Sequence, residues 1–363
     1  MQTPFQLMAK PTGSLCNLDC KYCFYLEKPH QQQRAMDDEI LETYIKNYLQ
    51  FTPQKTVTFL WQGGEPTLAG LDFYQKAITL QEKYANGKKI YNALQTNGLL
   101  LDEQWCQFLK KNNFLVGLSI DGPEHLHDIY RLTKSQKGTF HQVMKGLENL
   151  IAHNVSFNTL TVIHKKNVLF GKEIYQFLKK IGSNYMQFIP LMGEWEQQAS
   201  AKDYGQFMID IFDEWYANDI GKIGVQFIEQ WLMAFLGLQP SLCIFRKTCG
   251  DQMIIEQNGD IFSCDHYVYP HYKIGNILNT PLQDIVYSAK QQQFGLSKEK
   301  VSEKCQKCEF YFACHGGCPK HRTIQGFGEP HNILCEAYYN ALSHMAPNLK
   351  KLAIFLKQKQ KLL

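Results

Sequence analysis

Three cysteines stand close together near the start of the chain and could bind one metal centre. They are Cys16, Cys20 and Cys23, in a C-x3-C-x2-C arrangement, and the residues around them supply no fourth thiol. A structural zinc site is normally closed by four ligands, whereas a catalytic centre keeps one coordination position open. The spacing therefore favours an iron-sulfur cluster with one free iron over a zinc knuckle or a chance grouping of thiols.

Eight more cysteines crowd the last part of the chain, and eight is twice the number of ligands of a closed cluster. A C-x2-C-x5-C-x3-C array over residues 305–318 fits zinc as well as iron-sulfur ligation on spacing alone. A chain that already carries an open cluster has a use for further electron carriers, and this context favours iron-sulfur. The eight residues are Cys243, Cys249, Cys264, Cys305, Cys308, Cys314, Cys318 and Cys335.

The composition is that of an ordinary globular protein of 363 residues with twelve cysteines. The N-terminus lacks the features of a signal peptide, and a reducing cytosol keeps thiols available for metals. The longest apolar runs fall short of the ~20 residues that a membrane span requires. A formal charge of +4 without a dense basic block does not indicate nucleic acid. We therefore expect a cytoplasmic protein with neither a membrane nor a nucleic acid as partner.

The elements that must position these cysteines alternate between strands and helices, which predicts an α/β fold. Runs rich in β-branched and aromatic residues are typical of buried parallel strands, and segments of helical period separate them. With a short strand before Cys16, the pattern predicts a partial (β/α)6 barrel of TIM type. The predicted strands cover residues 57–61, 90–94, 115–120, 157–163 and 185–189, and the predicted helices cover residues 37–51, 71–84, 102–112, 140–153 and 169–181.

Polar or glycine-bearing segments follow three of the predicted strands. Residues 62–66 are Gln-Gly-Gly-Glu-Pro, residues 95–98 are Gln-Thr-Asn-Gly, and residues 121–123 are Asp-Gly-Pro. Chemistry in β/α barrels takes place at the carboxyl ends of the strands, so all three segments fall at the expected rim. A turn-forming role alone would explain any one of them. Three such segments behind a cysteine motif indicate a binding site.

The cysteine spacing resembles the signature of the radical S-adenosylmethionine (SAM) superfamily, in which three cysteines hold a 4Fe-4S cluster and SAM chelates the open iron. The resemblance implies a glycine-rich loop that lets the backbone approach SAM. It also places a guanidinium near the SAM carboxylate, although a surface salt bridge is the alternative for Arg131. The implied SAM contacts are Gly63, Gly64, Glu65, Asn97, Ser119 and Arg131.

The later cysteine array resembles the SPASM extension of radical SAM peptide-modifying enzymes, which holds two auxiliary 4Fe-4S clusters. Each cluster has four cysteine ligands and no open iron, so these clusters carry electrons without binding substrate. The pair Asn258-Gly259 also predicts a hairpin in this region. By the resemblance, Cys243, Cys249, Cys264 and Cys318 hold the first auxiliary cluster, and Cys305, Cys308, Cys314 and Cys335 hold the second.

Nearly the whole chain looks like the anaerobic sulfatase-maturating enzymes, which oxidise a cysteine or serine of a sulfatase to Cα-formylglycine. This resemblance implies three 4Fe-4S clusters, SAM, a sulfatase polypeptide as substrate and a cytosolic electron donor of the flavodoxin or ferredoxin type. It does not distinguish cysteine from serine as the target. The features specific to this branch are Phe24-Tyr25, Gln62 before the glycine loop, residues 95–98, and Asp265 after Cys264.

The resemblance also assigns roles to residues around the substrate. Asp265 is the implied general base, and Tyr25 and Gln95 face the substrate peptide. A turn-forming role is the alternative for Asp265, and core packing is the alternative for Tyr25. His266 is a competing base, because its ordinary pKa near 6.5 suits the task. His266 and residues 267–271 depart from the family pattern and leave an unusual substrate open.

The resemblance divides the chain into a radical SAM partial barrel (residues 1–235), a SPASM auxiliary-cluster domain (236–345) and a C-terminal helix (346–363). Two other functions stay open. One is a SPASM enzyme that forms thioether or carbon-carbon crosslinks in another ribosomal peptide. The other is a zinc-binding interaction protein without catalysis, which would be colourless, whereas three 4Fe-4S clusters give a brown protein with about twelve irons.

Overall fold

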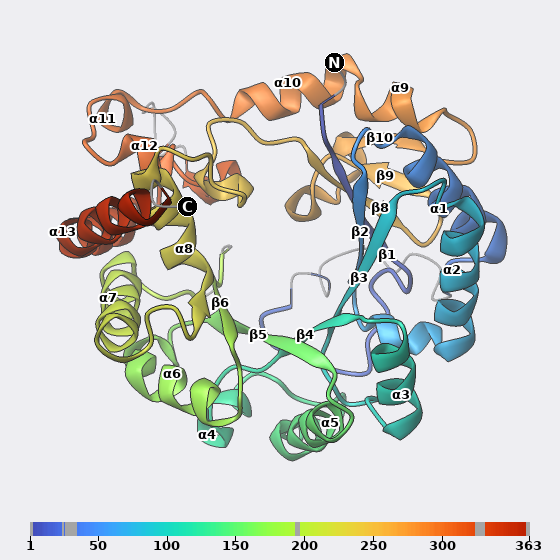
Figure 1. Ribbon diagram of the computed structural model, residues 1–363, viewed down its shortest axis with the longest axis horizontal. Coiled ribbons are helices and arrows are strands. Elements are labelled where there is room, and N and C mark those ends of the chain that lie inside the picture. Colours follow the sequence, from blue (N-terminus) through green and yellow to red (C-terminus); the bar gives the residue numbers. More distant parts are fainter. Residues whose placement is uncertain (1–2, 24, 26–34, 193–196, 324–330, 361–363) are drawn as a thin grey trace. The chain divides into compact units, whose positions relative to one another are not determined.

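Strands and helices alternate along the first half of the chain (Figure 1), and the α/β expectation is confirmed. The computed structural model describes residues 3–23, 25, 35–192, 197–323 and 331–360. Each predicted strand and helix is present, with small differences at its ends. The strands are β1 (Gln6–Lys10), β2 (Thr56–Trp61), β3 (Lys89–Thr96), β4 (Leu115–Ser119), β5 (Ser156–Ile163) and β6 (Tyr185–Pro190), and the helices are α1 (Asp38–Phe51), α2 (Leu71–Tyr84), α3 (Glu103–Lys111), α5 (Phe140–Ala152) and α6 (Gly171–Lys180).

The chain forms two units, each assembled from separate stretches of sequence. Unit 1 comprises residues 1–120, 127–158 and 250–295, and unit 2 comprises residues 121–126, 159–249 and 296–363. The domain boundaries inferred from the family resemblance stay predictions. The remaining α-helices and strands of the described residues are α4 (Glu124–His127), α7 (Ala201–Asn218), β7 (Gly224–Val225), α8 (Gln226–Leu236), β8 (Gln252–Glu256), β9 (Asp260–Phe262), β10 (Lys273–Asn276), α9 (Leu282–Val286), α10 (Ala289–Ser297), α11 (Glu303–Gln306), α12 (Tyr311–Cys314), β11 (Arg322–Thr323), β12 (His331–Asn332) and α13 (Cys335–Gln360).

In unit 1 the strands follow the order β10-β9-β8-β1-β2-β3-β4. Strands β8, β1, β2, β3 and β4 are parallel, and β8, β9 and β10 form an antiparallel meander. The predicted turn at Asn258-Gly259 joins β8 to β9, so the hairpin is confirmed. The pairing of β8 with β1 places Glu256 beside Lys10 at the carboxyl ends of both strands.

Helices α1, α2 and α3 lie along the same face of β1 to β3 (Figure 1), and the core of unit 1 is packed between them. Aromatic rings from the sheet and from α1 meet there at right angles, with Tyr44 6.0 Å from Trp61 and 5.6 Å from Phe59 between ring centroids. Such edge-to-face pairs add stability beyond the buried area. Asp37 and Asp102 accept hydrogen bonds from the first turns of α1 and α3, which fixes where these helices begin.

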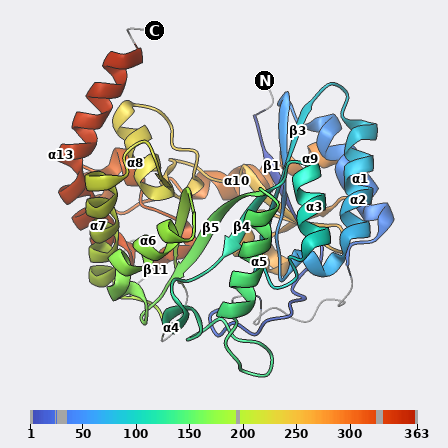
Figure 2. The same cartoon turned by 60° about the horizontal axis from the view of Figure 1, so that its bottom comes forward.

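In unit 2, the part of β5 from Thr159 onward, β6 and β7 are parallel neighbours, and helix α13 packs along α7 and α8 (Figure 2). Helix α13 begins at Cys335, within the segment that the family resemblance assigns to the cluster domain. Its last turn carries the basic residues Lys357 and Lys359. Throughout the described residues, none of the helices combines the length and the apolarity needed to cross a membrane.

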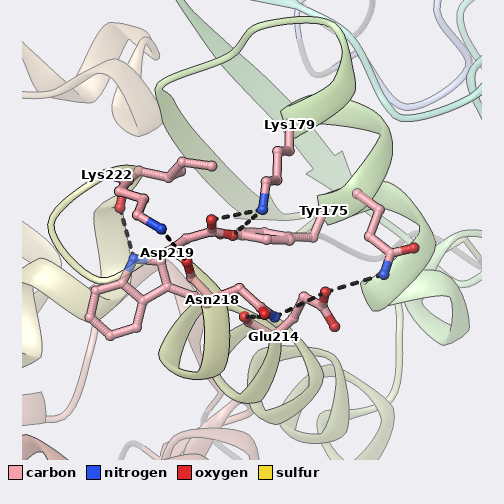
Figure 3. Close-up of polar contacts among 9 residues, drawn as sticks. Tyr175, Lys179, Glu214, Asn218, Asp219 and Lys222 are labelled. Carbon is pink, nitrogen blue, oxygen red and sulfur yellow. Dashed lines mark hydrogen bonds and ion pairs between the residues drawn. The ribbon is translucent and has the colours of Figure 1, made fainter.

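A buried carboxylate joins α6 to the end of α7 in unit 2. Asp219 accepts a hydrogen bond from the hydroxyl of Tyr175 at 2.9 Å, and both of its oxygens accept from Nζ of Lys179, at 2.7 and 2.8 Å. Figure 3 shows both side chains of α6 pointing at this carboxylate. Asp219 also caps α7 through its amide, which donates to the carbonyl of Trp215 at 2.8 Å. Burial of Asp219 is therefore balanced by hydrogen bonds and by an opposite charge.

Candidate active site

The loop of residues 16–23 follows β1 and is braced by a neighbouring segment of unit 1. The amide of Asp19 donates to the carbonyl of Leu132 at 2.8 Å. The amide of Lys21 donates to the carbonyl of Tyr130 at 3.0 Å. These bonds hold the backbone of the loop, while its three thiols stay partly exposed. The loop therefore presents three sulfur donors from a fixed frame.

Several of the predicted site residues lie near Cys16 and affect the pKa of its thiol. Burial is the main reason that the pKa of its thiol is raised to about 11, and the nearby charges of Glu65 and Cys23 add to this effect. A hydrogen bond from the amide of Leu18 and the charge of Arg131 act in the opposite direction. Iron must displace the thiol proton, so cluster binding here releases protons. The donor set, three thiols in one braced loop, fits a cluster with one open iron.

The glycine loop packs directly against the chain that leads into the cysteine loop. The amide of Gly64 donates to the carbonyl of Gly13 at 2.8 Å, and the amide of Glu65 donates to the carbonyl of Leu15 at 2.8 Å. A Cβ on Gly64 would lie 2.2 Å from the carbonyl oxygen of Leu15, so this position requires glycine. Gly63 has a φ of 140°, which also favours glycine. Contact of these residues with SAM stays a prediction.

Glu65 is fully buried, and its carboxylate is occupied by protein donors. Oε1 accepts from the amide and the hydroxyl of Thr67, at 3.0 and 2.6 Å, and from the hydroxyl of Thr96 at 2.7 Å. Oε2 accepts from the amide of Asn97 at 2.8 Å. Burial raises the pKa of Glu65, and these hydrogen bonds partly offset the rise. Glu65 thus ties together the loops after β2 and β3 and helps to fix the shape of the glycine loop.

The other predicted SAM contacts lie on different parts of unit 1. Nδ2 of Asn97 donates to Sγ of Cys16 at 3.9 Å. Arg131 is buried, with its guanidinium carbon 5.7 Å from the centroid of the Tyr22 ring. Ser119 is the last residue of β4 and is largely buried. The structure therefore brings Asn97 and Arg131 to the cysteine loop, whereas for Ser119 it shows only a position at a strand end.

A buried lysine connects the predicted base with a predicted substrate residue. Lys10 is the last residue of β1, and its Nζ lies 2.6 Å from Oδ1 of Asp265 and 5.3 Å from the ring centroid of Tyr25. The Lys10 side chain is 0% exposed, whereas that of Asp265 is 23% exposed. The sequence-based prediction missed Lys10. The available signal was its place at the end of the first strand, where barrel chemistry takes place.

Gln62 links the ammonium group of Lys10 to Gln95, the second predicted substrate residue, by hydrogen bonds. Nζ of Lys10 donates to Oε1 of Gln62 at 2.7 Å, and Nε2 of Gln62 donates to Oε1 of Gln95 at 2.9 Å. The sequence marks Gln62 only as a feature of the family branch. Asp265, Tyr25 and Gln95, which the resemblance assigns separately, therefore belong to one network around Lys10.

Glu256 is a second buried group that the sequence-based prediction missed. It ends β8, pairs with Lys10 in the register of the sheet and is 2% exposed. Burial is the main reason that the pKa of the Tyr25 hydroxyl is raised. The charge of Glu256 adds to this rise, and the charge of Asp265 makes a smaller contribution. Two carboxylates and one ammonium group therefore surround Tyr25. Because its ring is largely buried, contact of Tyr25 with substrate stays a prediction.

Four of the later cysteines lie near one another in unit 2. Burial is the main reason that the pKa of the Cys314 thiol is raised to about 12, and the charges of Cys305, Cys335 and Cys308 raise it further. Two of the four belong to short helices, α11 and α12, and Cys335 begins α13. These are the residues predicted to hold the second auxiliary cluster. Four thiols in one place fit a cluster without an open iron.

A buried lysine of unit 2, Lys298, lies near three other cysteines. Nζ of Lys298 donates to the carbonyl of Cys243 at 2.5 Å, and the side chain is fully buried. Burial lowers the pKa of Lys298 to about 8, while the charges of Cys243, Cys249 and Cys318 act to raise it. These three are predicted ligands of the first auxiliary cluster. The fourth predicted ligand, Cys264, belongs to unit 1, and its grouping with the others stays a prediction.

Comparison with known proteins identifies the family. Residues 11–178 match the Radical SAM superfamily, and residues 243–309 match an iron-sulfur cluster-binding domain of the SPASM type. The serine-type anaerobic sulfatase-maturating enzyme of Bacteroides thetaiotaomicron is 40% identical over 372 residues, which cover 95% of this chain and 90% of that protein. This chain belongs to the anaerobic sulfatase-maturating enzymes.

This sulfatase-maturating family member is similar to relatives of the cysteine type as well as of the serine type. The cysteine-type anaerobic sulfatase-maturating enzyme of Clostridium perfringens is 34% identical over 96% of this chain and 98% of its own length. A solved structure, native anSMEcpe with bound AdoMet and Cp18Cys peptide, has a TM-score of 0.90 at 33% identity and covers 97% of this chain and 99% of that one. Streptococcus suis SuiB bound to its precursor peptide SuiA shares the fold, with a TM-score of 0.65 at 17% identity.

Within this anaerobic sulfatase-maturating enzyme, unit 1 holds the residues predicted for SAM, for the first cluster and for the base. The cysteine loop, the glycine loop and the Lys10 network all belong to residues of that unit. Radical SAM and SPASM domains bind 4Fe-4S clusters, and the related solved structures contain bound AdoMet. The cofactors expected from the sequence, 4Fe-4S clusters and SAM, are confirmed at the level of the family.

Proposed function

We propose that this protein oxidises a cysteine or serine of a sulfatase polypeptide to Cα-formylglycine. One observation carries the proposal: the chain aligns over 95% and 96% of its length with relatives named as serine-type and cysteine-type anaerobic sulfatase-maturating enzymes. The network of Asp265, Lys10 and Gln95 in the same unit as the cysteine loop supports it. Because relatives of both types are similar to the chain, the target residue stays open between cysteine and serine.

The cysteines are proposed to hold three 4Fe-4S clusters. When bound there, the first cluster and SAM would supply the radical chemistry that removes a hydrogen atom from the substrate Cβ, and the auxiliary clusters would supply an acceptor for the next electron. The ligands of the first cluster are Cys16, Cys20 and Cys23. Those of the auxiliary clusters are Cys243, Cys249, Cys264 and Cys318 for one, and Cys305, Cys308, Cys314 and Cys335 for the other.

A residue of the protein must accept the proton that this oxidation releases. Conversion of CH2–OH to C=O, or of CH2–SH to C=S, requires the substrate to lose one hydrogen atom, one electron and one proton. Asp265 is proposed to accept the proton from the hydroxyl or thiol, because its carboxylate is partly exposed and is held by Lys10. His266 is the alternative acceptor. Tyr25 and Gln95 are proposed to orient the peptide.

Two further assignments complete the proposal. A flavodoxin- or ferredoxin-like protein is proposed to donate the electron that starts each reaction, because the first cluster must be reduced before SAM is cleaved. The cytoplasm is the proposed location, since none of the twelve cysteines forms a disulfide in the structure and a reducing compartment keeps thiols available for metals.

The test uses two peptides that differ only at the target residue, S-x-P-x-R and C-x-P-x-R. Anaerobically reconstituted protein is incubated with SAM, a reductant and either peptide, and the products are identified by mass spectrometry. The serine peptide is expected to lose two hydrogen atoms. The cysteine peptide is expected to lose two hydrogen atoms and, after hydrolysis of C=S with release of hydrogen sulfide, to carry oxygen in place of sulfur. Cleavage of SAM with both peptides unchanged would overturn the proposal and favour another ribosomal peptide as substrate.

A further inference from the structure

Lys10 makes a directional contact beyond its ion pair. Its ammonium group is fully buried, which is strongly unfavourable unless an opposite charge is near. Oδ1 of Asp265, 2.6 Å away, supplies that charge. The hydrogen bond from Nζ to Oε1 of Gln62, at 2.7 Å, is an additional contact that leads away from Asp265. This second contact determines how neighbouring amides are oriented.

Lys10 fixes the orientation of two side-chain amides in succession. An ammonium group only donates hydrogen bonds, so Gln62 must turn its carbonyl oxygen toward Lys10. Nε2 of Gln62 then faces Gln95, which accepts with its own Oε1 at 2.9 Å. If the Gln62 amide were reversed, two donors would meet at Lys10. If only the Gln95 amide were reversed, two donors would meet between the glutamines.

Gln95 ends this chain of hydrogen bonds with its Nε2 group available. The side chain is half-buried, and within the described part of the chain its Nε2 has no hydrogen-bond partner. The next residues, Thr96 and Asn97, are anchored by the carboxylate of Glu65, so the end of β3 is held in place. A fixed amide at the carboxyl end of a barrel strand therefore offers N–H groups, and no acceptor, to a ligand.

We propose that Lys10 is a positioning residue that makes Gln95 present N–H donors to a carbonyl oxygen of the substrate peptide. The inference rests on the proposed function, because it takes the sulfatase peptide as the ligand. A backbone carbonyl only accepts hydrogen bonds and matches this donor, whereas a backbone N–H does not. Lys10 thereby sets the hydrogen-bond polarity of the peptide site through Gln62.

The first experiment compares two substitutions of Gln95 by peptide affinity rather than by turnover. Reconstituted protein with SAM but without reductant is titrated against fluorescent S-x-P-x-R and C-x-P-x-R peptides, and Kd is measured by anisotropy. Gln95→Met removes the donor at similar size and is expected to weaken binding roughly three- to tenfold, the value of one hydrogen bond. Gln95→Glu still accepts from Gln62 but turns an acceptor toward the peptide, so it is expected to bind more weakly than Gln95→Met. Equal or tighter binding by Gln95→Glu would overturn the inference.

The second experiment reverses the chain of hydrogen bonds without changing Gln95. In Gln62→Glu one carboxylate oxygen accepts from Lys10 and the other accepts from Nε2 of Gln95, whose Oε1 must then face the ligand. This variant is expected to weaken peptide binding, and adding Gln95→Met to it is expected to restore part of the affinity. The effect of Gln95→Met thus changes sign between the two backgrounds. A loss of the same size in both would show that Lys10 sets no polarity.

Controls separate this inference from the proposed function. SAM affinity without peptide is expected to be unchanged in the Gln95 variants, and a parallel weakening would assign the acceptor to SAM and overturn the inference. If wild-type protein bound neither peptide, the proposed function would fail and this inference with it. If wild-type protein oxidised a peptide while Gln95→Glu bound it normally, only this inference would fail. Iron content and visible absorbance verify that each variant is loaded.

Discussion

Asp265 combines the properties that a proton acceptor needs at the proposed site. Its carboxylate is partly exposed, its Oδ1 lies 2.6 Å from the buried ammonium of Lys10, and the residue directly follows the predicted ligand Cys264. Asparagine at this position keeps a carbonyl oxygen for Lys10 but cannot accept a proton at neutral pH. The substitution Asp265→Asn therefore separates the chemical role from the structural one.

We expect Asp265→Asn to slow formylglycine formation by roughly 10² to 10⁴-fold, the usual contribution of a positioned acid-base group. Formation of 5'-deoxyadenosine and the iron content are expected to stay near wild-type values, because the first cluster and SAM are not touched. Both products are measured in the same reaction by mass spectrometry. His266→Gln is the matched control. If Asp265→Asn stayed coupled at the wild-type rate and His266→Gln did not, the base would be His266.

Glu65 offers a second prediction for a single side chain, because its two oxygens face only donors. In Glu65→Gln the new Nε2 group meets a donor, either the amide of Asn97 or those of Thr67 and Thr96. We expect the free energy of unfolding to fall by about 1–3 kcal/mol, the cost of leaving a buried polar group unsatisfied. The measurement is urea denaturation under anaerobic conditions. Glu82→Gln, exposed on α2, is the control and is expected to change stability by less than about 0.5 kcal/mol.

At the scale of the elements, local patterns predicted what is local. The helical period of α2 and the apolar run of β2 lie within short windows, and the turn at Asn258-Gly259 needs only two residues. The pairing of β8 with β1 could not be predicted in this way, because Gln6 of β1 pairs with Gln252 of β8 and the two strands therefore lie far apart in the sequence. That pairing brings Lys10 and Glu256 side by side.

The same reasoning explains which site residues the sequence revealed. Cluster-binding cysteines can be recognised by their spacing, and a glycine loop can be recognised by its composition. A single lysine at the end of a strand, such as Lys10, has no partner at a fixed spacing, and its function depends on strand register. Lys298 is hidden for the same reason, since the carbonyl of Cys243 that it contacts lies far away in sequence.

The junction between α6 and α7 gives a prediction at this scale. Asp219→Ala removes the partner of the buried Tyr175 hydroxyl and of Lys179 (Figure 3). We expect a loss of about 1–3 kcal/mol in the free energy of unfolding, measured by urea denaturation. Asp213→Ala on α7 removes an exposed hydrogen bond with His344 and should cost less than about 1 kcal/mol. Equal losses in the two variants would show that the buried carboxylate does not join the helices.

At the scale of the whole molecule, the cysteines divide between the two units. Cys16, Cys20 and Cys23 belong to unit 1, and the four predicted ligands of the second auxiliary cluster belong to unit 2. Hydrogen bonds within unit 1 brace the first loop, whereas the later thiols interact with one another in unit 2. Loss of the first three ligands should therefore leave the later sites able to bind iron.

The variant in which Cys16, Cys20 and Cys23 are all changed to alanine tests this division. We expect it to lose SAM cleavage completely and to retain about eight of the roughly twelve irons that three 4Fe-4S clusters contain. Iron is measured by chelation assay after anaerobic reconstitution, and 5'-deoxyadenosine is measured with a chemical reductant. Changing Cys305, Cys308, Cys314 and Cys335 together is the reciprocal variant, expected to lose about four irons and to keep SAM cleavage. If the first variant bound no iron at all, the later sites would depend on the first loop, and the two sets of cysteines would not be independent.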